Sequence, residues 1–270
     1  MAPLAINLAG SDDQKNQWLP KIAGGECVIG VGLSEYVGAR EDAGIEFSNG
    51  KLSGRCLFLI DGKNADAYLL ANKSGELFLV EASAPGIEVI ELTTVDKTRT
   101  SIELILKNVD ADLLSGSDNK SIIEKVLDAG RIMLAADTVG AAQVMLDKSV
   151  AYSLERKQFG RLIGSFQAVK HMCAEMAAEL EPCHSMIWHA AHCFDNVPEE
   201  ARLMACQTKA HISEVGQQIS KTATEVHGGM GFTDELGLHY WFKRIGLNRQ
   251  LLGSPELIRE EAGRLQGFDQ

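Results

Sequence analysis

The stretch LERKQFG, residues 154–160, lies between two long helical patterns in the C-terminal half of the chain. Apolar residues recur at steps of three and four up to about Tyr152, and the same period restarts at Phe166. The stretch therefore predicts a chain reversal that presents a guanidinium and an aromatic ring side by side. An arginine fork binds phosphate and a phenylalanine ring offers a flat apolar wall, so this corner suits an anionic, planar ligand. The alternative is a solvated Arg156 in a helix turn, with Phe159 as a core plug.

The composition is that of an ordinary globular protein with an acidic surface. The chain has 270 residues, of which 45% are hydrophobic and 23% charged, so it can bury a core and hold more than one structural unit. Its net charge of -11 argues against binding to nucleic acid or to an anionic membrane surface. Any phosphate site must therefore be local. The sequence holds no apolar run of about 18 residues, which predicts no spanning helix, and its first residues do not form a signal peptide.

Six cysteines are scattered through apolar or helical contexts without a CxxC pair: Cys27, Cys56, Cys173, Cys183, Cys193 and Cys206. This pattern predicts reduced, buried thiols of a cytoplasmic protein. One helix face places His189, His192 and Cys193 at spacings that metal ligands use, with Cys183 and His184 nearby. No ligand from elsewhere in the sequence completes that set, so we predict no metal site.

The N-terminal half combines a short helix with extended segments. The helix is expected over Ser11–Ala23, with Ser11 or Asp12 as N-cap and a glycine pair at its end. Turn signals such as Ser48-Asn49-Gly50 then separate about seven β-rich runs, and their close spacing predicts an antiparallel sandwich or barrel. The expected strands are Cys27–Leu33, Ile45–Ser48, Lys51–Ile60, Ala67–Ala71, Leu77–Glu81, Ile87–Ile90 and Ile102–Val109.

The C-terminal half is predicted to be an antiparallel bundle of helices. A third long helix runs from about Glu199 to Val226 and is closed by the glycine-rich turn 227–231. Shorter helices are expected at about Leu238–Arg249 and at Pro255–Leu265, the latter capped by a serine. A proline at position 182 should kink the second long helix. The predicted fold class is therefore α+β, with an antiparallel β-sandwich or barrel domain followed by an antiparallel four-helix bundle.

Five segments in this order resemble the acyl-CoA dehydrogenase family. They are QKNQWLPKIAGG at 14–25, ERKQFG at 155–160, FQ at 166–167, EVHGGMGF at 225–232 and GSPELIRE at 253–260. The resemblance implies a remnant of the family's N-terminal helical domain at 1–25, a β-domain at 26–115 and a C-terminal helical domain at 116–270. Most of the N-terminal domain would be missing from these residues, by truncation or because the gene lacks it. It also implies FAD, an acyl-CoA substrate and a homo- or hetero-tetramer with another subunit of this family, and leaves open an electron-transfer flavoprotein as acceptor.

The first of these motifs implies a binding site for the diphosphate and adenine end of FAD. In the family, its arginine and phenylalanine contact a cofactor that sits mainly in a neighbouring subunit. Arg156, Gln158 and Phe159 match that motif, and Phe166 and Gln167 match the next one.

The glycine turn implies a second contact with the same cofactor. Gly228 and Gly229 match the family glycines that let backbone approach FAD, a role that the lack of Cβ makes reasonable. The glutamine usual three residues before them is Glu225 here. An anion near a diphosphate is unfavourable unless the side chain points away or is protonated.

The reactive end departs from the family. A carboxylate must remove the α-proton of the thioester, and the two positions where family members carry it hold Leu252 and Gly130. Neither residue can accept a proton, so no catalytic base is expected at these positions.

The β-domain has changed as well. FLIDG at 58–62 stands where the family has Trp-Ile-Ser/Thr-Asn-Gly, so a hydroxyl that meets the flavin ring has become an aliphatic chain. Of the flavin-facing motif, SEYVGAR at 34–40 keeps only Ser34 and Glu35.

Three functions fit these observations. The one we favour is a non-catalytic subunit of a heteromeric acyl-CoA dehydrogenase, as in steroid-side-chain enzymes, which completes the FAD site of an active partner. The second is an active dehydrogenase with a displaced base such as Glu256 or Glu35, although Glu256 also suits a helix N-terminus. The third is a flavin-free binding or scaffold protein, in which the glycine turn is an ordinary helix C-cap.

Overall fold

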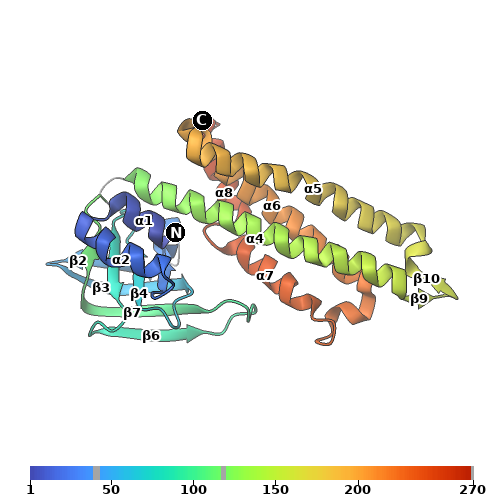
Figure 1. Ribbon diagram of the computed structural model, residues 1–270, viewed down its shortest axis with the longest axis horizontal. Helices are drawn as coiled ribbons and strands as arrows, with labels where there is room; N and C mark the ends of the chain where they lie inside the picture. The colour runs from blue at the N-terminus through green and yellow to red at the C-terminus, as the bar shows by residue number, and fades with distance from the viewer. Residues whose placement is uncertain (39–42, 117–119, 269–270) are drawn as a thin grey trace. The chain divides into compact units, whose positions relative to one another are not determined.

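The computed structural model describes residues 1–38, 43–116 and 120–268. Internal contacts divide the chain into two compact units, Met1–Leu127 and Asp128–Gln270 (Figure 1). The expected α+β fold is confirmed, because a β-sheet is followed by a set of long helices. The expected domain boundaries at residues 25 and 115 stay a prediction.

Helices of the first unit begin where the sequence offers a cap. They are α1 (Ala2–Ala9), α2 (Asp12–Ala23) and the single turn α3 (Ser34–Val37). Ser11 is the N-cap of α2: its hydroxyl accepts from the Gln14 N–H at 3.2 Å, and the Gln14 side chain accepts from the Ser11 N–H at 2.9 Å. This reciprocal capping box satisfies two backbone donors that a helix start leaves open.

The sheet follows the predicted strands closely. In the described part of the chain they are β1 (Ile29–Gly32), β2 (Gly44–Ser48), β3 (Lys51–Ile60), β4 (Ala67–Ala71), β5 (Leu77–Glu81), β6 (Ile87–Leu92), β7 (Ser101–Asp110) and β8 (Asp112–Leu113). Their order is β6-β7-β3-β1-β4-β5-β8, with β2 paired to β3. The pairings are antiparallel with one difference from expectation: β1 runs parallel to β4, with Val31 opposite Leu69. Every residue of β4 is buried, which explains its continuous apolar sequence.

The second unit is built from long helices. They are α4 (Lys120–Glu155), which starts before the unit boundary, α5 (Gln167–Asn196), α6 (Pro198–His227), α7 (Leu238–Gln250) and α8 (Pro255–Leu265). The predicted helices are confirmed. Residues that recur at helical spacing form one core, which includes Met145, Met176, Ile219 and Ile245. Helix α5 continues past Pro182, and the kink expected there stays a prediction.

None of the helices within the described residues combines the length and the apolar composition needed to cross a bilayer.

Candidate cofactor-binding site

The stretch 154–160 ends α4 and reverses the chain through a short hairpin (Figure 1). Strand β9 (Lys157–Gln158) pairs antiparallel with β10 (Arg161–Leu162). The turn residues Phe159 and Gly160 both have positive φ, 53° and 75°. Two consecutive residues of this kind are characteristic of the type I′ turn, whose twist suits a two-residue hairpin loop. The predicted reversal is confirmed.

Backbone contacts fix the base of the hairpin. The Arg156 N–H donates to the Tyr152 carbonyl at 2.9 Å, and the Arg156 carbonyl accepts from the Ile163 N–H at 2.8 Å. A Cβ at Gly164 would lie 2.8 Å from the Ser153 carbonyl oxygen, so glycine allows the returning chain to pack tightly on α4. The Arg156 side chain itself is exposed.

Aromatic and cationic side chains gather on this hairpin. Phe159 is 92% exposed, so the alternative that it plugs the core is wrong. Its ring and that of Phe166 form a T-shaped pair with centroids 6.1 Å apart, and the Arg161 guanidinium lies over the Phe166 ring, 3.9 Å from its centroid. Gln158 and Gln167 are exposed on the same segment. The sequence analysis missed Arg161, although it directly follows the quoted motif.

A stacked pair of rings joins the hairpin end of α4 to the glycine turn. Tyr152 and His227 have ring centroids 4.6 Å apart and planes inclined by 30°. Tyr152 lies one helical turn before Arg156, and His227 directly precedes Gly228. The two motifs predicted to bind one cofactor therefore meet at the same end of the second unit.

The glycine turn leaves its backbone accessible. Gly228 has φ 58° and ψ -141°, a conformation that side chains with Cβ disfavour. A Cβ at Gly228 or Gly229 would meet nothing within 4 Å, whereas a Cβ at Gly231 would lie 2.7 Å from the Thr224 carbonyl oxygen. Gly231 is therefore needed for packing, while the first two glycines border open space.

The charges at this end suit an anion apart from two exposed carboxylates, those of Glu155 at the end of α4 and of Glu225. Arg156, Lys157 and Arg161 provide positive charge on the exposed hairpin. Glu225 is exposed on the last turn of α6. Open backbone, cations and an uncovered aromatic ring together fit the diphosphate and adenine end of a dinucleotide.

In the first unit, Ser34 and Glu35 form hydrogen bonds with β3 at an irregularity in its pairing with β7, between Cys56 and Leu59. The Ser34 hydroxyl donates to the Leu57 carbonyl at 2.7 Å, while Glu35 accepts from the Leu57 N–H at 2.7 Å and from the Cys56 thiol at 3.1 Å. Phe58 follows with φ 53° and is half exposed. Residues 39–40 of the same predicted motif lie outside the described residues.

Ile60, which stands where the family has a serine or threonine hydroxyl, lines a small cavity. Ile60 borders a space of about 270 Å³ together with Val31 and Asp61. An aliphatic side chain there cannot donate a hydrogen bond to a flavin ring.

Both expected positions of the catalytic base lie in packed surroundings. Leu252 is buried with φ 58°, and its carbonyl accepts from Arg131 Nε at 3.2 Å. Gly130 is buried on α4. Arg131 is 2% exposed and also binds Glu261, at 2.8 Å between Nη2 and Oε2. An ion pair between Arg131 and Glu261 thus connects α4 to α8 beside Leu252.

The two candidates for a displaced base are both engaged elsewhere. Glu256 is exposed in the first turn of α8 and forms an ion pair with Arg249. Hydrogen bonds from its own backbone and from Ser254, together with Arg249, hold its pKa at about 2, which makes a weak base. Burial raises the pKa of Glu35 against the bonds it accepts, but both carboxylate oxygens already have donors.

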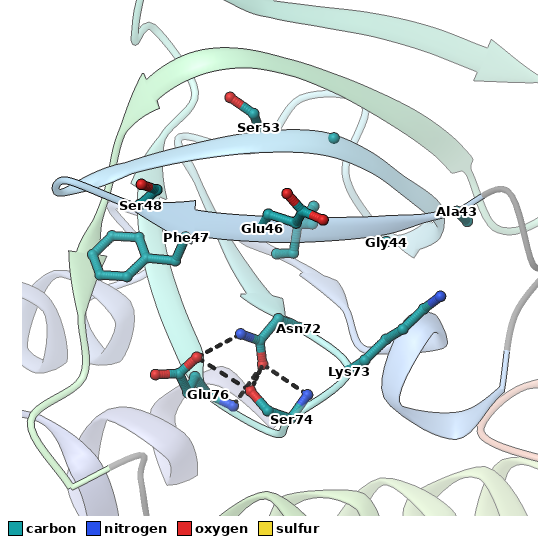
Figure 2. Close-up of a pocket in the computed structure, with 12 residues that line it drawn as sticks. Ala43, Gly44, Glu46, Phe47, Ser48, Ser53, Asn72, Lys73, Ser74 and Glu76 are labelled. Atoms are coloured by element: carbon teal, nitrogen blue, oxygen red, sulfur yellow. Dashed lines mark hydrogen bonds between the residues drawn. The ribbon is translucent and has the colours of Figure 1, made fainter.

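The first unit also holds a groove of about 880 Å³. Figure 2 shows that it is bordered by β2 and by the turn after β4. Asn72, Ser74 and Glu76 there bond to one another, including 2.6 Å from Asn72 Nδ2 to Glu76 Oε2 (Figure 2). These polar groups hold the turn in shape, and none of the predicted site residues lines the groove.

The metal ligands considered from the sequence are only partly brought together. Ligand atoms of His189 and Cys193 meet that of Glu200 within 4.8 Å, whereas His192 contacts Asn196. Glu200 was missed because it belongs to the next helix.

Comparison with known proteins defines the class. The family model for the acyl-CoA dehydrogenase C-terminal domain matches residues 120–265. The probable acyl-CoA dehydrogenase YngJ of Bacillus subtilis is 30% identical over 272 residues, which cover 93% of this chain and 71% of YngJ. The chain belongs to the acyl-CoA dehydrogenase family.

Two further relatives differ in their described roles. The caffeyl-CoA reductase-Etf complex subunit CarC of Acetobacterium woodii is 29% identical over 252 residues, 84% of this chain and 65% of CarC. The solved Tcur3481-Tcur3483 steroid ACAD variant superposes with a TM-score of 0.87 at 27% identity, over 99% of this chain and 74% of that chain. This chain thus spans about two thirds to three quarters of these relatives.

Proposed function

We propose that this chain is a flavoprotein subunit of an acyl-CoA dehydrogenase that completes the FAD site of a partner and carries no catalytic base of its own. One contrast supports the proposal. The hairpin and glycine-turn end of the second unit is exposed, cationic and aromatic, whereas Leu252 and Gly130 stand where the family places its base. A subunit that binds its partner's cofactor needs the hairpin and the glycine turn, but it does not need a catalytic base.

In this proposal each residue at the exposed end has a defined task. Arg156 holds the diphosphate through charge-assisted hydrogen bonds, and Phe159 offers its flat face to the adenine. Gly228 and Gly229 let backbone N–H groups approach the same cofactor. Bound FAD would supply the hydride acceptor for α,β-dehydrogenation of an acyl-CoA thioester.

The remaining predicted residues act around these four. Gln158, Phe166 and Gln167 flank the hairpin, and we infer that the exposed side chain of Glu225 points away from the diphosphate. Ser34 serves the flavin ring end indirectly, because its hydroxyl fixes the backbone beside Phe58.

The partner in this proposal is a second, full-length member of the family in a hetero-tetramer. Likeness to the Tcur3481-Tcur3483 steroid ACAD, whose designation joins two components, supports a two-component assembly and an acyl chain of the fatty-acid or steroid side-chain class. Likeness to a subunit of an Etf complex supports an electron-transfer flavoprotein as a partner that exchanges electrons with this assembly. Six free cysteines support a reducing, cytoplasmic location.

Co-expression with the full-length family member that co-purifies tests the proposal. We expect no turnover of acyl-CoA thioesters with an artificial electron acceptor for this chain alone, and both turnover and flavin absorption for the complex. Turnover by the isolated chain that is lost in Glu35→Gln would instead establish an active enzyme with a displaced base. Absence of flavin from every preparation would establish a flavin-free protein.

A matched pair of variants tests the hairpin in the same complex. Arg156→Ala should lower flavin content, because it removes a charge-assisted hydrogen bond of roughly 1.5 to 3 kcal/mol. Lys157→Ala removes the same charge from the next residue, which is not among the residues matched to the cofactor motif, and should lower flavin content less. Equal flavin content in the two variants would contradict the proposed role of Arg156.

A further inference from the structure

The junction of α5 and α6 brings three metal-binding side chains together. Only Val197 separates the last residue of α5 from the first of α6, so the end of one helix packs beside the start of the other. His189 and Cys193 share a face of α5 at a spacing of four residues, and Glu200 lies in the first turn of α6. Their ligand atoms all lie within 4.8 Å of one another.

The spacing of these atoms approaches that of a tetrahedral zinc site. Bond lengths of about 2.3 Å to sulfur and about 2.0–2.1 Å to nitrogen or oxygen place neighbouring ligand atoms about 3.6 Å apart. Cys193 Sγ lies 3.7 Å from His189 Nε2 and 4.0 Å from Glu200 Oε2. Small rotations of the exposed His189 and Glu200 side chains would bring these distances to about 3.6 Å.

The environment also suits a cation. The Cys193 side chain is fully buried, while His189 and Glu200 are exposed, so the donors converge on a place that solvent can reach. One thiolate and one carboxylate would neutralise a divalent ion, and Glu199 adds further negative potential beside them. Imidazole and thiolate ligands favour zinc-class ions over magnesium or calcium.

The same three residue types could instead form a nucleophilic cysteine with a histidine base. That arrangement needs a stabilised thiolate. The Cys193 thiol is instead buried, with Sγ 4.0 Å from Glu200 Oε2, and a neighbouring carboxylate disfavours the thiolate of an activated nucleophile. A bound cation would favour that thiolate, since metal ligation deprotonates a thiol.

We propose that His189, Cys193 and Glu200 bind one divalent metal ion of the zinc class and that the fourth position is open to water. The ion ties the end of α5 to the start of α6. Because α5 has 30 residues and is about 45 Å long, this site is remote from the hairpin at the other end of the helix. The metal site therefore does not depend on the proposed flavin function.

Cobalt binding by the chelator-treated full-length chain tests this site directly. Titration with Co²⁺ should give sulfur-to-cobalt charge-transfer absorption that saturates at one equivalent and disappears when Zn²⁺ is added. His189→Gln and Glu200→Gln should each weaken Zn²⁺ binding, measured by competition with a chromophoric chelator, by roughly tenfold or more. Glu199→Gln removes a neighbouring charge without removing a ligand and should change the affinity less than Glu200→Gln.

Folding of the variants is checked by circular dichroism. His189 and Glu200 are exposed, so their variants should fold, whereas the Cys193→Ser variant affects a buried side chain. Loss of the charge-transfer band in folded Cys193→Ser would support the site. Absence of that band in the unaltered chain, or equal affinities of Glu199→Gln and Glu200→Gln, would overturn it.

Discussion

Tyr152 stacks on His227 at 4.6 Å between ring centroids and so connects the last turn of α4 to the last turn of α6. His227 Nδ1 donates to the Ala223 carbonyl at 2.7 Å, and the side chain is buried. Burial lowers the pKa of His227 below its ordinary value of 6.5; hydrogen bonds to the backbone of Ala223 and Lys148 oppose this shift, and the charge of Lys148 adds to it. The imidazole in this stack is therefore neutral near pH 7.

Acidification should loosen this end of the second unit. Since the folded pKa of His227 is below 6.5, its contribution to stability is complete above about pH 6.5 and is lost as the pH falls toward the folded pKa. Urea unfolding between about pH 7.5 and about pH 5.5 should thus show a smaller loss of stability in His227→Gln than in the unaltered chain. His211→Gln, at an exposed histidine on the same helix, is the matched control. The same slope in all three proteins would contradict this assignment.

The two glycines after His227 should respond differently to alanine. Gly228→Ala places a Cβ on a backbone with φ 58° and ψ -141°, so we expect destabilisation of about 1–3 kcal/mol. Gly229→Ala adds a Cβ that meets nothing within 4 Å and should leave unfolding nearly unchanged. If backbone at this turn approaches FAD, Gly229→Ala should nevertheless lower the flavin content of the complex. Full flavin content in folded Gly229→Ala would argue against that approach.

Phe159 should show opposite effects on stability and on cofactor binding. Its φ of 53° is unfavourable for phenylalanine, and its 92% exposure means that its ring adds little packing within the chain. Phe159→Asn creates the Asn-Gly pair preferred in a type I′ turn and should raise the free energy of unfolding by up to about 1 kcal/mol. The same variant should retain less flavin, because it removes the flat apolar wall. A variant that is both less stable and fully flavinated would refute this interpretation.

Local patterns explain why much of the fold could be predicted from the sequence. Strands β3, β4 and β5 and helix α8 begin and end at the predicted residues, because turn residues and a serine cap mark their ends. Helix α1 was not predicted, since its short apolar sequence offers no polar face that would show a helical period. The parallel pairing of β1 with β4 depends on a contact distant in sequence, which periodicity does not encode.

The candidate site was predicted as a set of motifs rather than as an arrangement. The reversal at 154–160 followed from two interrupted helical periods, but the exposure of Phe159 depends on the type I′ turn. The Tyr152–His227 stack joins residues that are 75 positions apart in sequence, so only the folded chain shows that two motifs share one end. The contact of Glu200 with His189 and Cys193 is also visible only in the folded chain. Glu200 belongs to the next helix, which a single residue links to the preceding one.

Glu261 should be essential for stability even though it resembles its exposed neighbours in sequence. Arg131 is 2% exposed; it donates to both Glu261 oxygens, at 3.2 and 2.8 Å, and to the Leu252 carbonyl. Removing one partner of a buried ion pair leaves the other charge uncompensated, which costs about 3–5 kcal/mol. Asp128 remains 3.6 Å from Arg131, so we expect Glu261→Gln to fall near the lower end of that range.

Glu260→Gln is the matched control on the same helix. Glu260 pairs with Arg264 on the exposed surface, where an ion pair contributes at most about 1 kcal/mol. Burial acts to raise the pKa of Glu261, but the hydrogen bonds and charge of Arg131 and the charge of Arg202 outweigh it and keep that pKa below 4.5. This contribution to stability is therefore present above about pH 4.5 and is lost as the pH falls through the folded pKa. Urea unfolding should show the Glu261→Gln deficit at neutral pH and its decline in acid. Equal stabilities of the two glutamine variants would mean that Arg131 does not depend on Glu261 to hold the backbone at Leu252.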